Sequence, residues 1–219
     1  MALGGGFFLT QNKVLPGAYI NFISAARASA TLSDRGIAAM PFVADWGEEG
    51  KVIEVTTEDF QKYSLQLFGY DYTHPQMQMF REIFNNAKVL YGYRLNSGTT
   101  KAKNDYAVAK YGGSRGNAIT IVIENDVDTE GGFLVKTLLD NTEADIQSVK
   151  KAQEFQDNDF VTFQKEATLQ TTAGMPLTGG ADGDGRTGAN YQKFLEKIEK
   201  YSFHTLGCNT AEKEVIDLF

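Results

Sequence analysis

The residues best placed to do chemistry form a glycine-rich run, GDGRTG, at Gly183–Gly188. This run matches the G-x-G-x-x-G pattern of dinucleotide-binding turns, and it precedes a predicted helix as such turns do. The overlapping residues 180–187 also fit a phosphate-binding loop, except that Arg186 stands where lysine belongs. A nucleotide-dependent enzyme that uses this turn is therefore one alternative for the function.

Three features count against nucleotide binding at this turn. Asp182 and Asp184 would lie beside the bound phosphates and repel them. The preceding segment, 167–176, is polar and threonine-rich, whereas the motif requires a buried strand there. No acid ends the next predicted strand, 203–208, where a ribose-binding carboxylate would fall. We therefore expect a glycine-rich turn that caps a helix.

The remaining candidate groups assemble neither an active site nor a metal site. Asp182 and Asp184 resemble the start of a calcium loop, but Arg186 occupies the third ligand position and no glutamate closes the loop. His204 and Cys208 would lie about 13 Å apart on one strand, too far for a hydrogen bond. Two histidines and one cysteine are too few for zinc unless carboxylates help. We expect no catalytic residue, no cofactor and no metal.

Composition narrows the class of protein further. The chain has 219 residues with 21 basic and 28 acidic side chains, a net charge of −7, which argues against broad binding of a nucleic-acid backbone. No apolar run approaches the ~20 residues that span a bilayer, and the first residues lack the pattern of a signal peptide. A single cysteine cannot form an internal disulfide. We expect a chain that folds in a reducing compartment, without membrane insertion or direct nucleic-acid contact.

The elements that would position these residues begin as an α/β unit. Apolar runs at 37–43 and 52–55 predict two strands, and Thr56 with Asp59 forms a capping box for a helix that ends near Gly69. The apolar face of that helix is predicted to carry Phe60, Tyr63, Ser64 and Leu67. A second helix should open at Pro75, with a stripe made of Met79, Phe80, Ile83, Phe84 and Ala87. Alternation at 89–95 predicts the next strand.

A β-rich section follows and interrupts the α/β pattern. Strands are predicted at 118–123, 133–139 and 159–163, while 150–157 is ambiguous and could be a short helix. We expect roughly 100–178 to be an inserted or second domain with a mostly antiparallel sheet. The helical pattern then resumes after Thr187, which is predicted to cap a helix that carries Tyr191, Phe194, Leu195, Ile198 and Tyr201.

The end of the sequence predicts a strand at 203–208 and the start of another helix at 211–219. The fold class we expect is therefore mixed α+β: an α/β core that is incomplete at its C-terminus and is interrupted by a β-rich domain.

The first 33 residues have no acid and only two basic residues, Lys13 and Arg27. They show no helical periodicity, and they contain several large apolar side chains around a Pro-Gly turn signal. Each such side chain gains about 1.5–3 kcal/mol when it is fully buried, so the segment is expected to seek a partner surface. A frayed terminus is the simpler alternative.

The sequence resembles the tail sheath proteins of contractile phage tails and phage-tail-like bacteriocins, in the branch typical of Gram-positive prophages. The likeness spans nearly all of the chain, and its segments keep their order. They are TQNKVLPGAYINF at 10–22, SDRG at 33–36, DWG at 45–47, DF at 59–60, FG at 68–69, YGGSRGN at 111–117, LTGG at 177–180 and Tyr191.

The resemblance implies a structural subunit that polymerises around a tail tube as stacked six-membered rings and contracts to drive the tube through a target envelope. It implies an extended arm at 1–33, a core domain at 34–100 and 179–219, and a β-rich inserted domain at 101–178. The implied partners are other copies of the subunit through strand exchange, the tube protein and the baseplate, in a particle assembled in the bacterial cytoplasm. The arm residues expected to contact a neighbouring subunit are Val14, Leu15, Ala18, Tyr19, Ile20 and Phe22.

One departure from the family pattern concerns length. Sheath subunits of this branch continue beyond the position of Phe219, where they complete the core and add a C-terminal arm. We therefore expect a truncated form, a split gene product or a processed fragment that cannot build a contractile sleeve alone. A further alternative is a surface-binding module whose β-rich section recognises a cell-wall glycan or a host receptor.

Overall fold

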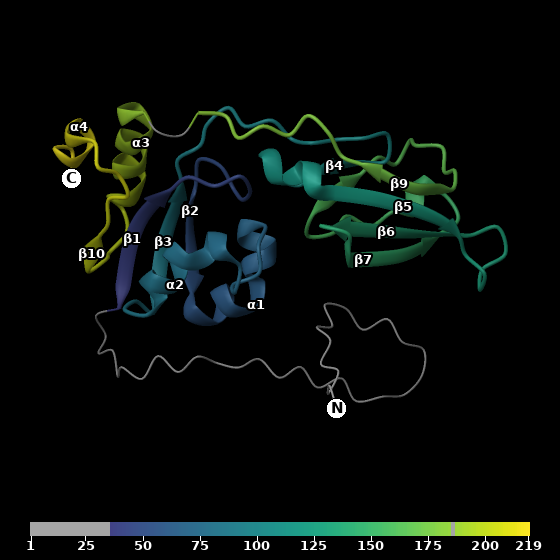
Figure 1. Cartoon of the computed structure of the whole chain (residues 1–219), viewed down its shortest axis with the longest axis horizontal. Helices are drawn as coiled ribbons and strands as arrows, with labels where there is room; N and C mark the ends of the chain where they lie inside the picture. Colours follow the sequence, from purple (N-terminus) through teal and green to yellow (C-terminus); the bar gives the residue numbers. More distant parts are fainter. Residues whose placement is uncertain (1–35, 185–186) are drawn as a thin grey trace.

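The computed structural model describes residues 36–184 and 187–219, which form two regions joined by a pair of crossing segments (Figure 1). We call residues 36–95 together with 187–219 the α/β region, and residues 96–184 the β region. The chain enters the β region after residue 95 and returns to the α/β region at residue 187. The expected mixed fold of helices and sheets is confirmed.

The α/β region is built on a sheet with the strand order β10-β1-β3-β2. Its strands are β1 (Ile37–Phe42), β2 (Val52–Thr56), β3 (Val89–Arg94) and β10 (Thr205–Leu206). β1 runs parallel to both β3 and β10, and β2 is antiparallel to β3. The predictions of the first three strands are confirmed, but the strand predicted at 203–208 has only two paired residues.

Helices cover both faces of this sheet (Figure 1). On one face lie α1 (Thr57–Phe68), the 3-10 turn η1 (Pro75–Met77) and α2 (Gln78–Phe84). On the other face lie α3 (Gly188–Ile198) and α4 (Lys213–Ile216). Leu90 of β3 packs with the first group, whereas its neighbours Tyr91 and Tyr93 pack with the second. This alternation follows from the two-residue period of a strand.

The capping signals that predicted α1 are confirmed, but the face of the helix that is buried differs by one residue from the predicted one. Thr56 and Asp59 form a complete capping box, and Gly69 ends the helix with a left-handed φ of 80°. The buried face carries Phe60, Ser64 and Phe68 rather than Tyr63, which is 51% exposed. The correct stripe therefore follows the i, i+4, i+8 positions, and the prediction of Tyr63 on the apolar face was wrong.

Aromatic rings dominate the core beneath α1 and α2. The rings of Phe68 and Phe80 have centroids 4.3 Å apart, and those of Phe60 and Phe84 are stacked at 4.9 Å. Phe42 of β1 contacts the same group edge-on, with its centroid 5.1 Å from that of Phe80. Such pairs add to the free energy gained by burying apolar area, so this face is tightly fixed to the sheet.

The β region contains a four-stranded antiparallel sheet with the order β7-β6-β5-β9, and a pair of short strands packs against it. The long strands are β5 (Ile119–Asn125), β6 (Phe133–Leu139), β7 (Thr142–Val149) and β9 (Thr172–Pro176). The short pair is β4 (Ala107–Ala109) and β8 (Val161–Phe163). The mostly antiparallel sheet is confirmed, and the ambiguous segment 150–157 contains only a 3-10 turn, η3 (Ala152–Glu154).

Three strands of the β region were missed from the sequence. β7 and β9 are the two end strands of the sheet, so only one edge of each is paired. β7 carries two acids, and β9 contains Gly174 and Pro176, which are typical of end strands but weaken a strand signal. β4 is only three residues long. The tight turn between β6 and β7 uses Asp140 and Asn141, both with positive φ.

Two segments connect the α/β region to the β region, and they run side by side (Figure 1). Residues 97–103 run antiparallel to residues 178–184, with bridges at Ser97–Asp184 and Thr100–Ala181. The Ser97 amide donates to the Asp184 carbonyl at 2.7 Å, and the Asp184 amide returns the bond at 3.1 Å. The entry to the β region and its exit are therefore fastened to each other.

Candidate functional site

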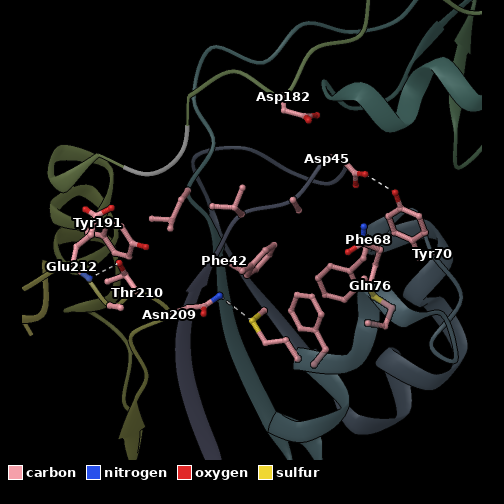
Figure 2. A pocket seen from close by; sticks show the side chains of 17 residues that line it. Phe42, Asp45, Phe68, Tyr70, Gln76, Asp182, Tyr191, Asn209, Thr210 and Glu212 are labelled. Atoms are coloured by element: carbon pink, nitrogen blue, oxygen red, sulfur yellow. Dashed lines mark hydrogen bonds between the residues drawn. The ribbon is translucent and has the colours of Figure 1, made fainter.

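A pocket of about 770 Å³ opens at the carboxyl ends of β1 and β3 (Figure 2). After β1 the chain forms β2 and then α1 and α2 on one face of the sheet. After β3 it passes through the β region and then forms α3 on the other face. In open α/β sheets, ligands bind where the connections that follow two adjacent strands lead to opposite faces of the sheet. The rings of Phe42, Phe68 and Phe80 belong to the apolar lining of the pocket.

Two carboxylates that line this pocket, those of Asp45 and Asp182, accept hydrogen bonds from neighbouring protein groups. The Tyr70 hydroxyl donates to Asp45, which Figure 2 shows at the rim. Asp182 accepts from both the backbone amide and the hydroxyl of Ser114, at 2.6 Å and 2.9 Å. Within residues 36–184 and 187–219, no group of three or more His, Cys, Asp or Glu side chains could hold a metal ion. We call the contact between the α/β region and the β region beside this pocket the junction; its main side chains are Trp46, Arg94 and Arg115.

Arg94 lies at the centre of this junction, and its side chain is only 1% exposed. Its Nε donates to the Ala44 carbonyl at 3.1 Å, and its Nη1 donates to the carbonyls of Gly47 and Gly112 at 2.7 Å and 2.8 Å. Burial lowers the pKa of Arg94, while the charge of Glu49 opposes this shift. Because Gly112 belongs to the β region, the buried guanidinium joins that region to the end of β3 and to the β1–β2 connection.

Trp46 carries the apolar part of the junction. It lies in the β1–β2 connection, yet its ring is packed into the core of the β region, edge-on to Tyr111 with centroids 5.3 Å apart. Its Nε1 donates to the Gln66 carbonyl of α1 at 3.0 Å. The indole thus satisfies its polar group in one region and buries its apolar surface in the other.

Arg115 forms a second polar clamp. Its Nε donates to the carbonyl of Gly69 at 2.8 Å, and its Nη1 donates to Asp140 in the β6–β7 turn at 2.9 Å. The guanidinium also lies over the ring of Tyr70, with Cζ 4.3 Å from the centroid. Burial, followed by the hydrogen bond to Asp45, raises the pKa of Tyr70 above its ordinary range. Arg115 and Tyr70 therefore fix the end of α1 to the β region.

Two glycines allow the backbones of the junction to approach closely. A Cβ at Gly113, where φ is 138°, would lie 1.8 Å from the Asp45 carbonyl oxygen. A Cβ at Gly183, where φ is 64°, would lie 2.2 Å from the Ser97 carbonyl oxygen. No side chain fits either position. The glycine of the nucleotide-like motif is therefore used for packing against the crossing segment.

The other sequence candidates are placed as follows. Thr187 stands at the predicted N-cap position of α3, but its side chain makes no capping hydrogen bond to the backbone. Residues 185–186 of the glycine-rich run lie outside the described part of the chain. The Nδ1 atom of His204 accepts a hydrogen bond from the Ile37 amide at 3.4 Å, and Cys208 packs against the α3 core. The six predicted arm residues, Val14 to Phe22, also lie outside the described residues.

Arg94 and Trp46 were not singled out as site residues from the sequence. Trp46 had a usable signal: it is the only tryptophan of the chain, and it stands in a short polar connection where a large ring needs a partner surface. Arg94 had none, because an arginine at a strand end is ordinary until its neighbours are known.

Two family models match the chain in succession. Residues 35–95 match the model described as the N-terminal region of domain III of tail sheath protein Gp18. Residues 96–182 match the model of the phage tail sheath protein beta-sandwich domain.

Relatives and solved structures agree with these models. The chain is 33% identical over 232 residues to the XkdK protein of the phage-like element PBSX from Bacillus subtilis, covering 95% of this chain and 49% of that protein. The crystal structure of a sheath tail protein from Desulfitobacterium hafniense superposes with a TM-score of 0.77 at 35% identity, covering 92% of this chain and 48% of that one. A Listeria innocua sheath tail protein gives a TM-score of 0.71 at 30% identity, covering 84% and 43%.

The fold and the junction define a two-region protein in which a β region is fastened to an α/β region. With both family models and the solved structures in agreement, the chain belongs to the phage tail sheath proteins. It spans about half the length of the curated relatives that it matches.

Proposed function

We propose that this chain serves in a contractile tail sheath, which polymerises around a tail tube as stacked six-membered rings and contracts to drive the tube through a target envelope. The observation that carries the proposal is the succession of the two sheath family models over residues 35–182. The junction supports it, because a subunit that transmits force needs its parts held in fixed relation. On this proposal the role is mechanical, without a catalytic residue or a cofactor.

The proposed partners are other copies of the subunit, the tube protein and the baseplate, with neither direct nucleic-acid contact nor membrane insertion. No helix within residues 36–184 and 187–219 is both long and apolar enough to cross a bilayer. The proposed location is a virion or a phage-tail-like bacteriocin particle assembled in the bacterial cytoplasm. The proposed domain division is an arm at 1–33, a core at 34–100 and 179–219, and an inserted domain at 101–178; the paired crossings near 97–103 and 178–184 support it.

The arm is the proposed contact between subunits. Added as a strand to a neighbour, it would supply main-chain hydrogen bonds, while alternate side chains fill pockets. The contact residues on this proposal are Val14, Leu15, Ala18, Tyr19, Ile20 and Phe22.

Sedimentation velocity tests the arm proposal directly. The chain of 219 residues should self-associate, and deletion of residues 1–33 should leave a monomer. A variant with Leu15→Asp and Ile20→Asp should behave like the deletion, whereas Val127→Asp, at a side chain 95% exposed in the β5–β6 loop, should behave like the parent. Self-association that is unaffected by the deletion would refute the proposal. Negative-stain microscopy should show no long tubes from this chain alone.

A further inference from the structure

Within residues 36–184 and 187–219, two buried side-chain atoms have no hydrogen-bond partner: Oε1 of Gln66 and Nη2 of Arg94. Both residues belong to the junction, since the Gln66 carbonyl binds Trp46. The amide of Gln66 can exchange its oxygen and nitrogen by a half-turn about its last bond, whereas both terminal nitrogens of a guanidinium are donors. A half-turn therefore cannot supply Nη2 of Arg94 with a partner.

The position of Nη2 is fixed by the rest of the guanidinium. Nε and Nη1 of Arg94 donate to three backbone carbonyls, and the side chain is only 1% exposed. Nη2 lies beside Gly113, since a Cβ placed on that glycine would be 3.1 Å from it. Buried donors in folded proteins nearly always have an acceptor, because otherwise they lose the hydrogen bonds that water gave them in the unfolded chain. We therefore expect an acceptor next to Gly113.

The charge of Arg94 is balanced by carboxylates that do not bind it directly. Burial lowers the pKa of Arg94, and the negative charges of Glu49, Asp182 and Asp45 oppose this shift. In the described part of the chain these carboxylates accept their hydrogen bonds from groups other than the guanidinium: Glu49 from Gly98 and Thr99, Asp182 from Ser114, and Asp45 from Tyr70. The charges thus surround Arg94, while their own donors hold them in place.

The ligand of Nη2 must accept a hydrogen bond and carry no net charge. Three carboxylates would repel an anion, and the guanidinium would repel a cation. Water meets both conditions, because its oxygen accepts from Nη2 while its hydrogens can donate to a carboxylate, which offers about four acceptor positions. Buried waters commonly make about three hydrogen bonds to polar groups that lack protein partners.

We propose that one ordered water binds Nη2 of Arg94 and donates to the carboxylate of Asp182. It links the end of β3 to residues 178–184, which leave the β region. The geometry favours Asp182 over the other two carboxylates, because Ser114, the residue after Gly113, holds the Asp182 carboxylate through its amide at 2.6 Å and its hydroxyl at 2.9 Å. Nη2 and this carboxylate therefore flank the same two residues.

A second contact from the end of β3 leads to the same residue. The Nδ2 of Asn96, a side chain that is 3% exposed, donates to the Asp182 carbonyl at 2.8 Å. The water adds a contact to the side chain of Asp182, whose backbone is already bound, so β3 holds this residue at both ends. The inference is independent of the proposed function, because it concerns contacts within one chain.

A high-resolution crystal structure of the 219-residue chain tests the proposal. Electron density for one water should lie about 2.7–3.2 Å from both Nη2 of Arg94 and a carboxylate oxygen of Asp182. A direct hydrogen bond between these two groups would refute the proposal, and so would a position without density.

Oxygen-17 magnetic relaxation dispersion, which counts the waters held for long times inside a protein, tests the bridge in solution. Asp182→Ala removes the second partner of the water, so the signal should fall by the contribution of about one long-lived water. Asp184→Ala is the matched control, because Asp184 is exposed on the same segment, and it should leave the signal unchanged. Circular dichroism should show that both variants keep the fold of the parent.

Each outcome decides the question. A signal that Asp182→Ala leaves unchanged, or that both variants lower equally, contradicts the bridge. If Asp182→Ala does not fold, the crystal structure of the parent still tests whether the water lies between Arg94 and Asp182.

Discussion

Replacing Arg94 by methionine should loosen the junction without changing the volume of the site much. The substitution removes three donor contacts and leaves the buried carbonyls of Ala44, Gly47 and Gly112 without their partner. An unsatisfied buried acceptor costs about 1–3 kcal/mol. Part of this loss is offset, because the guanidinium no longer has to be desolvated. We therefore expect a loss of about 3–5 kcal/mol, a large part of the ~5–15 kcal/mol that stabilises a typical domain.

Urea unfolding followed by two signals measures this loss. Trp46 is the only tryptophan and lies in the junction, so its fluorescence reports the contact between the regions, while circular dichroism reports both sheets. The two transitions should coincide in the parent, and in Arg94→Met the fluorescence transition should come about 1–2 M urea earlier. Arg81→Met is the matched control, because Arg81 also binds two backbone carbonyls but outside the junction. A variant within about 1 kcal/mol of the parent, with coincident transitions, would refute the reasoning.

Three further predictions use the same fold. Gly113→Ala should lower the melting temperature by about 10 °C, because its Cβ would meet the Asp45 carbonyl, whereas Gly131→Ala, in open space, should lower it by only about 2–4 °C. Burial raises the pKa of Tyr70 on folding, so the parent's advantage over Tyr70→Phe should be full below pH ~10 and fall at higher pH in urea titrations. The hydrogen bond from Thr56 lowers the pKa of Asp59, so the parent's advantage of about 1 kcal/mol over Asp59→Asn should be present above pH ~4 and fade in acid.

The parts of the fold with strong local signals could be predicted from the sequence. The capping box at Thr56 and the glycine at the end of α1 identify that helix through contacts within a few residues. α3 shows its buried stripe plainly, because Tyr191, Phe194 and Ile198 recur at helical spacing against one face of the sheet. The ordered set of short motifs also indicated the sheath family, which the comparisons confirm.

The remaining elements depend on contacts distant in the sequence. β7 and β9 alternate weakly, because an end strand buries little, and only pairing with β6 and β5 defines them. The role of Arg94 is set by the carbonyl of Gly112, 18 residues away, together with those of Ala44 and Gly47. Gly183 illustrates the same point: the motif was visible, but what it packs against, the Ser97 carbonyl, was not.

The paired crossings at Ser97 and Asp184 bring the two ends of the β region within one hydrogen bond of each other. A segment whose two ends lie side by side can be replaced by a short turn, because none of the strands of the α/β sheet comes from it. Replacing the β region by a short turn between Ser97 and Asp184 would therefore not require the strands of the α/β sheet to be reordered. The residues that would have to change together with it are those at its base, with Trp46 and Arg94 first among them.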